Sequence, residues 1–215
     1  MKILKTGAAQ AGQVDENQLA MINRQTLRAV NADDVYVFRV VGCDDQPDRD
    51  FERFSIDALN ALAPLFVGKT VLMDHNWSAN CQSARIYNAY VDAENGVNRL
   101  ILCCYTLRAG NDAIIAAIDA GILREVSVSC AVRRTTCSIC GENYYRCAHT
   151  KGAEYDGKPC IGILEDPTDA YEVSFVAVPS QPGAGVVKSH KNHNDMLGSM
   201  VAAKAWFAAE QEKWR

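Results

Sequence analysis

Two β-rich segments joined by a tight turn place the strongest constraint on how this chain can fold. Residues 83–92 and 98–107 are rich in β-branched, aromatic and other apolar side chains. The Asn95-Gly96 step between them is a strong hairpin signal, because both residue types accept the positive φ angles of a two-residue turn. An antiparallel pair is therefore expected near the centre of the chain. Further strands are predicted at residues 35–41, 71–73, 124–134 and 170–178.

Helical patterns are few and short. Ser55 is a typical helix N-cap residue, and the helix that follows it is expected to end near Pro64. A second helix is predicted at residues 111–120, with isoleucines on one side and Gly121 just beyond its end. Strands outnumber helices, and strand and helix do not alternate regularly. The sequence therefore predicts a mainly β (α+β) fold, an antiparallel β-barrel-like domain with peripheral helices.

Composition divides the chain into an arm, a domain and a tail. Residues 1–32 are rich in Ala, Gln and Asn and are expected to form an N-terminal arm with one short helix. The domain itself is predicted at residues 33–187. Residues 181–195 contain Gly, Ser, Asn and Pro, a composition typical of an exposed linker. The tail at residues 188–215 is thus expected to hold the rest of this linker and a C-terminal helix that contacts another protein.

The charge and hydropathy of the chain limit its partners. Its 215 residues carry a formal net charge of −4, which offers no broad cationic surface for the phosphates that dominate nucleic-acid affinity. No stretch reaches the ~20 apolar residues needed to cross a bilayer, and residues 1–12 lack the apolar region of a secretory signal. We expect no nucleic-acid partner, no membrane partner and a cytosolic location.

The cysteines are the most specific local signal. There are nine in all, and an odd number without an export signal favours free thiols and metal ligation over disulfides. Cys137 and Cys140 are two residues apart, and Cys147 is followed closely by His149, which is the ligand spacing of a tetrahedral zinc site. Cys160 is an alternative to His149 as the fourth ligand. The competing interpretation is a loop with free thiols.

This cluster defines an expected zinc-knuckle insertion at residues 135–160, with one zinc ion per chain. Four protein ligands saturate a tetrahedral ion and leave no position for water. The expected role of the metal is therefore to stabilise the insertion and not to catalyse a reaction.

A histidine, a serine and a carboxylate at strand ends or on strand faces suggest nucleophilic catalysis when they are taken together. A hydroxyl nucleophile requires a base within hydrogen-bond reach, and that base requires an orienting partner. His75 follows a short apolar strand, and the period of two in the next candidate strand places Ser127 and Ser129 on one face. The same period places Glu172 and Ser174 together, opposite Tyr171, Val173 and Phe175. The chain has no Gly-x-Ser-x-Gly elbow, Walker loop or His-Glu-x-x-His helix.

The order of these features resembles the prohead (capsid maturation) serine proteases of tailed bacteriophages, whose fold is related to that of the herpesvirus assemblins. The resemblance extends over residues 35–187. The elements that carry it are residues 68–75, the hairpin, residues 120–123, residues 125–129 and residues 171–179.

The resemblance implies a serine endopeptidase with His75 as general base, Ser127 as nucleophile and Glu172 as third member. Ser129 stands where many relatives have glycine, so it remains the alternative nucleophile. Arg133 and Arg134 are oxyanion candidates by proximity alone.

The implied reaction is cleavage of scaffold and major capsid proteins, with the protease itself as a further substrate, during prohead maturation and virion assembly. The implied location is the host cytoplasm inside the assembling prohead, and a homo-oligomer is among the assemblies it allows. The alternatives are a catalytically silent capsid-assembly protein and a zinc-ribbon protein-binding module.

Overall fold

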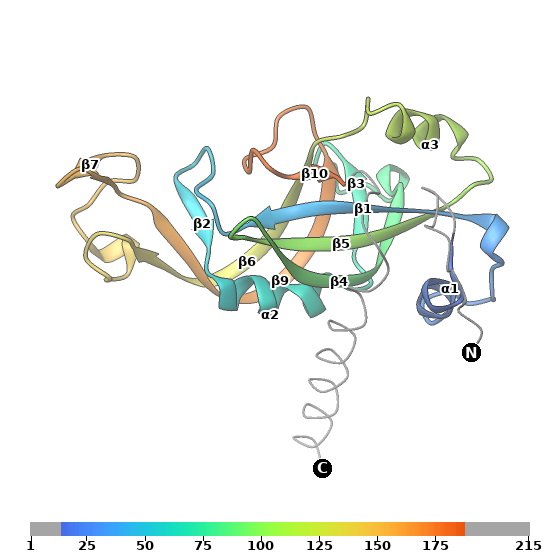
Figure 1. Cartoon of the computed structure of the whole chain (residues 1–215), viewed down its shortest axis with the longest axis horizontal. Coiled ribbons are helices and arrows are strands. Elements are labelled where there is room, and N and C mark those ends of the chain that lie inside the picture. Colours follow the sequence, from blue (N-terminus) through green and yellow to red (C-terminus); the bar gives the residue numbers. More distant parts are fainter. Residues whose placement is uncertain (1–13, 188–215) are drawn as a thin grey trace, which may run out of the picture.

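The predicted hairpin lies at the centre of the sheet in the computed structural model, which describes residues 14–187 (Figure 1). Strands β4 (Ala84–Glu94) and β5 (Val97–Leu107) pair antiparallel over nearly their whole length. Asn95 and Gly96 between them have φ angles of 54° and 80°, as a turn with two left-handed residues requires. The prediction of this hairpin is confirmed.

The remaining elements follow in chain order. They are α1 (Glu16–Asn23), η1 (Ala32–Asp34), β1 (Val35–Asp44), β2 (Glu52–Phe54), α2 (Ile56–Phe66), β3 (Thr70–Met73), η2 (Ala79–Cys81), α3 (Asp112–Asp119), β6 (Val126–Cys137), η3 (Tyr144–Arg146), β7 (Glu154–Tyr155), β8 (Lys158–Pro159), β9 (Gly162–Phe175) and β10 (Gly185–Val186). The fold is thus mainly β, as predicted. Helix α2 continues two residues past Pro64, because its last residue, Phe66, is fully buried in the core.

The sheet is mixed and not purely antiparallel. Its strand order is β10-β1-β5-β4-β3-β9-β2, and β6 pairs with β9. Strands β2 and β3 run parallel to β9, whereas β6 runs antiparallel to it. Since β6 takes up the whole length of one edge of β9, β2 and β3 must share the other edge. A parallel pair needs a long connection between its strands. The chain provides one, because the paired residues Thr70 of β3 and Glu172 of β9 are roughly a hundred residues apart.

The sheet curls but does not close into a barrel. Strand β10 meets the residues just before β6 at a short seam, where Glu125 bridges Gly185 and the amide of Val186 donates to the carbonyl of Arg124 at 2.8 Å. Because β10 is two residues long, it cannot extend this contact into a continuous ladder. The barrel-like prediction is therefore corrected to an open, curled sheet.

One face of the sheet forms the main core. Val71 of β3, Val126 of β6 and Val173 of β9 pack there with Leu59 and Phe66 of α2, and α2 lies along the lower side of the sheet in Figure 1. In each of these strands, the residues next to these valines point to the opposite face. That opposite face is therefore available for a site.

The chain after β9 is part of the fold up to residue 187, which corrects the prediction of a linker starting at residue 181. Gln181 is buried, and its Nε2 donates to Asp44 Oδ1 at 2.6 Å. Strand β10 then pairs with β1. The buried carboxylate of Asp44 recruits the Gln181 amide, a long-range contact that local composition does not reveal. The C-terminal helix predicted within residues 188–215 lies outside the described residues.

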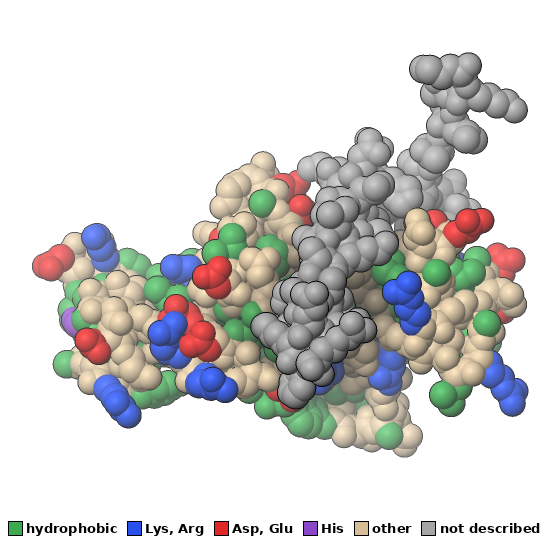
Figure 2. All heavy atoms as spheres, turned by 90° about the horizontal axis from the view of Figure 1, so that it is seen from below, with side chains coloured by type: hydrophobic (Ala, Val, Ile, Leu, Met, Phe, Trp, Pro, Cys, Tyr) green, Lys and Arg blue, Asp and Glu red, His purple; other side chains and the backbone are tan. Residues whose placement is uncertain are grey.

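The cysteine-rich segment projects from the far end of the β6–β9 pair, at the left of Figure 1. On the face drawn in Figure 2, basic and acidic side chains are interspersed along the molecule. Among residues 14–187, no helix has both the length and the apolar character needed to cross a membrane.

Replacing Gly185 with alanine should weaken the seam between β10 and β6. A Cβ at this position would lie 2.9 Å from the backbone carbonyl oxygen of Arg124, which cannot move aside as a flexible side chain can. We expect the free energy of unfolding to fall by about 1–3 kcal/mol, measured by urea denaturation. An unchanged denaturation midpoint would contradict this close approach.

Candidate active site and candidate metal centre

Strands β3, β9 and β6 present the predicted site residues on one face of the sheet. Leu72 pairs with Ser174 across β3 and β9. On the other edge of β9, Ser127 lies opposite Ser174 and Ser129 lies opposite Glu172. Directly opposed residues in a sheet point to the same side. The predictions that the two serines of β6 share a face, and that Glu172 and Ser174 share a face, are confirmed.

His75 reaches this face through a strained turn at the end of β3. Asp74 and His75 have φ angles of 52° and 51°, a region that residues other than glycine rarely occupy. The amide of Asn76 donates to the carbonyl of Met73 at 2.9 Å and closes the turn. Backbone strain of this kind is often found at functional sites. Here the turn brings the imidazole over β9.

The imidazole is held by a buried carboxylate. His75 Nδ1 lies 2.8 Å from Glu172 Oε1, and the side chain of Glu172 is 2% exposed. Acidic side chains are almost never fully buried unless they are paired. An ionised carboxylate only accepts hydrogen bonds, so the His75 proton is assigned to Nδ1 and the Nε2 lone pair is available as an acceptor. This is the tautomer of a general base.

Ser174 completes the support of this pair. Its Oγ donates to Glu172 Oε2 at 2.5 Å and accepts the backbone N–H of His75 at 3.0 Å. The hydroxyl therefore ties both the carboxylate and the histidine turn to β9, and its side chain is fully buried. The period of two predicts that Ser174 lies beside Glu172, but it does not indicate this supporting role. The signal was its period-two spacing from Glu172.

Ser127 and Ser129 are half-buried and remain accessible. Because Ser127 lies directly opposite Ser174, their Cβ atoms are separated by roughly 5 Å. No hydrogen bond joins Ser127 Oγ to His75 in the described part of the chain. Such bonds are often long in a free enzyme and tighten when substrate is bound.

A cleft of about 430 Å³ opens beside the His75–Glu172 pair. Leu72 and Glu172 contribute to its lining, and the rings of Trp77 and Tyr171 form an aromatic pair with centroids 5.6 Å apart. The prediction from period-two alternation that Tyr171 lies on the core side with Val173 is wrong, because Tyr171 is 40% exposed. The pairing register shifts between Ser129 and Cys130, opposite Glu172 and Ala170, so Tyr171 is an extra residue in a β-bulge, which re-aims its side chain.

Arg133 and Arg134 are too far from the serine to act on an oxyanion. They lie six and seven residues beyond Ser127 on the same strand, which corresponds to about 20 Å. Arg134 Nε instead forms ion pairs with Glu165 at 3.2 Å and Asp166 at 3.5 Å. Proximity in sequence did not become proximity in space, because β6 is long and extended.

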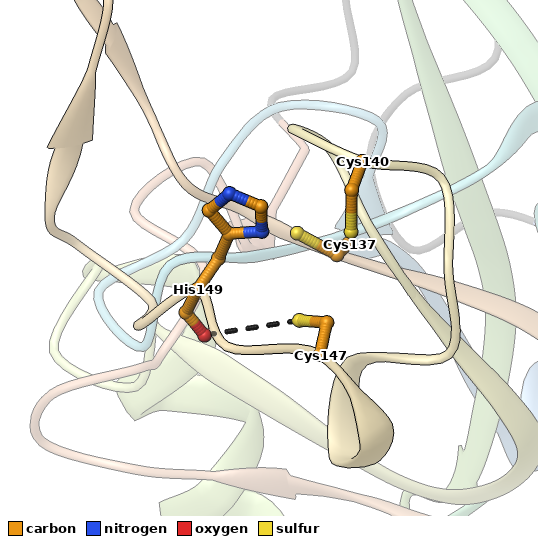
Figure 3. Close-up of side chains that lie close together, drawn as sticks. All are labelled: Cys137, Cys140, Cys147 and His149. Carbon is orange, nitrogen blue, oxygen red and sulfur yellow. Dashed lines mark hydrogen bonds between the residues drawn. The ribbon is translucent and has the colours of Figure 1, made fainter.

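The cysteine-rich insertion brings together a Cys₃His cluster. The ligand atoms of Cys137, Cys140, Cys147 and His149 all lie within 4.8 Å of one another, and their side chains converge in Figure 3. Gly141, with a φ angle of 76°, follows Cys140, and its amide donates to the carbonyl of Cys137 at 2.9 Å. These residues could hold one metal ion.

Two further observations fit a cation at this cluster. The Nδ1 atom of His149 is buried and has no hydrogen-bond partner among the described residues, which is unusual for a buried polar atom unless it binds an ion. Burial raises the pKa of the Cys137 thiol, but the backbone N–H groups of Cys140 and Ile139 outweigh this effect and lower that pKa to about 6. Thiolates are the form that ligates metals.

Cys160 lies at the edge of the same cluster. Its Sγ is 3.7 Å from Cys137 Sγ, and the residue is fully buried. Both fourth ligands considered from the sequence, His149 and Cys160, are therefore close to Cys137.

No family model, no curated protein and no solved structure matches this chain.

Replacing Ser174 with alanine should destabilise the fold. The change would leave the Glu172 carboxylate and the His75 amide without a shared partner, and an unsatisfied buried group costs about 1–3 kcal/mol. Thermal and urea denaturation measure the loss. Ser127→Ala is the matched control, since its hydroxyl makes no hydrogen bond within residues 14–187, and we expect a change within about 0.5 kcal/mol. Equal stability of the two variants would contradict the supporting role of Ser174.

Proposed function

We propose that this protein is a serine endopeptidase in which Ser127 is the nucleophile, His75 the general base and Glu172 its orienting partner. The observation that carries the proposal is the buried Glu172 carboxylate 2.8 Å from His75 Nδ1, with a serine on the adjoining strand of the same face. A base and its orienter beside an accessible hydroxyl are the parts that nucleophilic hydrolysis needs.

In the proposed reaction, His75 Nε2 takes the Ser127 proton as Oγ attacks the carbonyl carbon of a peptide bond. Glu172 stabilises the imidazolium that forms and keeps its ring in place. His75 then returns the proton to the leaving amine, and the same base activates the water that hydrolyses the acyl-enzyme.

The backbone of β6 offers a donor for the oxyanion. Just before β6, the carbonyl of Glu125 accepts from Val176, the residue after β9, whereas the carbonyl of Arg124 accepts from Val186 on β10. Backbone groups alternate between the two edges of a strand, so the amide of Val128 is expected to point away from β9. We propose this amide, one residue after the nucleophile, as an oxyanion donor.

The register favours Ser127 over Ser129. The His75 turn leaves β3 just beyond Met73, which pairs with Phe175. Ser127 lies opposite Ser174, the site-facing residue of β9 that is nearest to this turn. Ser129 lies opposite Glu172, two residues further along β9 from the turn. Ser129 remains the alternative nucleophile.

We propose that the Cys₃His cluster binds one structural zinc ion, because thiolate and imidazole ligands in a compact set suit zinc. Cys137 lies ten residues along β6 from Ser127, or about 30 Å. The metal would therefore stabilise the insertion, and the hydrolytic chemistry would not use it.

The resemblance to prohead proteases supports a biological setting for this activity. The proposed substrates are phage scaffold and major capsid proteins, and the proposed location is the assembling prohead in the host cytoplasm. Self-cleavage is proposed to occur after Val187, since residues 181–187 are built into the fold.

Ser127→Ala and His75→Ala should each abolish peptide cleavage, with losses of at least about 10³-fold, because members of a catalytic triad act as a unit. The assay is a proteome-derived peptide library, with cleavage products identified by mass spectrometry. Glu172→Gln should retain measurable activity, since glutamine can still orient the ring. The intact mass of wild type, compared with that of Ser127→Ala in the same incubation, reports self-cleavage.

Ser129→Ala is the matched control for the nucleophile. It removes the same hydroxyl from the same face of the same strand and should retain activity. Loss of activity in Ser129→Ala with retention of activity in Ser127→Ala would identify Ser129 as the nucleophile. Full activity in both variants would end the serine peptidase proposal.

Protein purified without chelator should contain one zinc ion per chain, measured by elemental analysis. Chelation should increase proteolysis of the insertion before it affects the sheet. His149→Ala should lower zinc affinity more than Cys160→Ser does. The reverse order would give a four-cysteine ligand set, and absence of metal would reject the zinc site.

A further inference from the structure

We infer that the cleft beside the His75–Glu172 pair is a specificity pocket, which takes a large, uncharged apolar side chain of the substrate close to the scissile bond. This inference rests on the proposed peptidase function. It adds the class of side chain that the enzyme selects and the residues that select it.

The first observation is the exposure of two aromatic side chains. Trp77 is 67% exposed and Tyr171 is 40% exposed, yet their rings lie against each other at an interplanar angle of 51°. Leu72, which is 3% exposed, and Ala79 also line the cleft. Exposed apolar groups that form one continuous surface mark binding sites far more often than single exposed side chains do.

The second observation is the way the chain couples this cleft to the proposed chemistry. Trp77 lies two residues after His75 in the same loop, and Tyr171 immediately precedes Glu172. The β-bulge gives β9 an extra residue at Tyr171. Bulges of this kind often re-aim a side chain next to an active site. Without it, period-two alternation would direct Tyr171 into the core with Val173.

The third observation is the charge of the cleft. Its charged lining residues are Lys69 and Glu172. Lys69 Nζ is paired with Asp169 at 3.1 Å. Both carboxylate oxygens of Glu172 are already engaged, Oε1 by His75 and Oε2 by Ser174. Among the described residues that line the cleft, no charge is left unpaired to attract a charged side chain, and the aromatic wall favours a large apolar one.

The test is cleavage-site profiling of the full chain with the proteome-derived peptide library. We expect wild type to enrich a large apolar residue (Leu, Met or Phe) at one position near the cleaved bond. In a pair of synthetic peptides that differ only by Leu or Ala at that position, wild type should prefer Leu by roughly tenfold or more in kcat/KM. Trp77→Ala and Tyr171→Ala should each reduce this preference to within about threefold, mainly through a higher KM for the Leu peptide.

Two variants keep the test specific. Trp77→Phe preserves an aromatic wall and should retain most of the preference. Tyr145→Ala removes a tyrosine that is 78% exposed on the insertion, far from the cleft, and should leave both peptides cleaved as in wild type. Thermal denaturation shows whether each variant is folded. If Trp77→Ala does not fold, Tyr171→Ala provides the test of the pocket.

The outcomes separate the pocket from the peptidase. If wild type cleaves peptides but shows no apolar preference, enriches a charged residue, or keeps its preference in both alanine variants, the pocket inference is overturned and the peptidase proposal stands. If folded wild type cleaves no peptide and its Ser127 does not react with a fluorophosphonate, the peptidase proposal fails and the pocket inference fails with it.

Discussion

The site depends on one buried carboxylate. Glu172 sits on the face of the sheet opposite the main core, and its two oxygens are held by the imidazole of His75 and the hydroxyl of Ser174. A buried charge without such partners would cost several kcal/mol, so the strained turn at Asp74 and His75 and the fully buried Ser174 are coupled to it. The interaction that would orient a catalytic base also fixes the end of β3 on β9.

Alternate residues of strand β9 face the core and the candidate site. Val173 and Phe175 face the core, while Glu172 and Ser174 face the site. The same strand pairs with β3 on one edge and with β6 on the other, so it brings the histidine turn and the serine strand to opposite sides of Glu172. The bulge at Tyr171 breaks the alternation once and directs an aromatic ring beside the site. At its other end, the β6–β9 pair carries the Cys₃His cluster, about 30 Å from Ser127.

The local parts of this arrangement could be predicted from the sequence. The Asn95-Gly96 turn gave the hairpin, period-two alternation placed Ser127 with Ser129 and Glu172 with Ser174, and ligand spacing gave the Cys₃His cluster. The non-local parts could not be predicted. The parallel pairing of β3 with β9, the burial of Gln181 against Asp44 and the bulge at Tyr171 all arise from contacts between distant segments. The left-handed turn at Asp74 and His75 contains no glycine to signal it, and the role of Ser174 follows from that turn.

The proposed reaction requires that His75 and Glu172 activate Ser127. Reaction with a fluorophosphonate measures this activation, because a base-activated serine Oγ attacks phosphorus and expels fluoride, and peptide mapping then identifies the phosphonylated residue. We predict one adduct on Ser127 in the wild-type protein, with the adduct lost in His75→Ala and unchanged in Ser129→Ala. An adduct on Ser129, equal labelling in His75→Ala, or no labelling of the folded protein would contradict it.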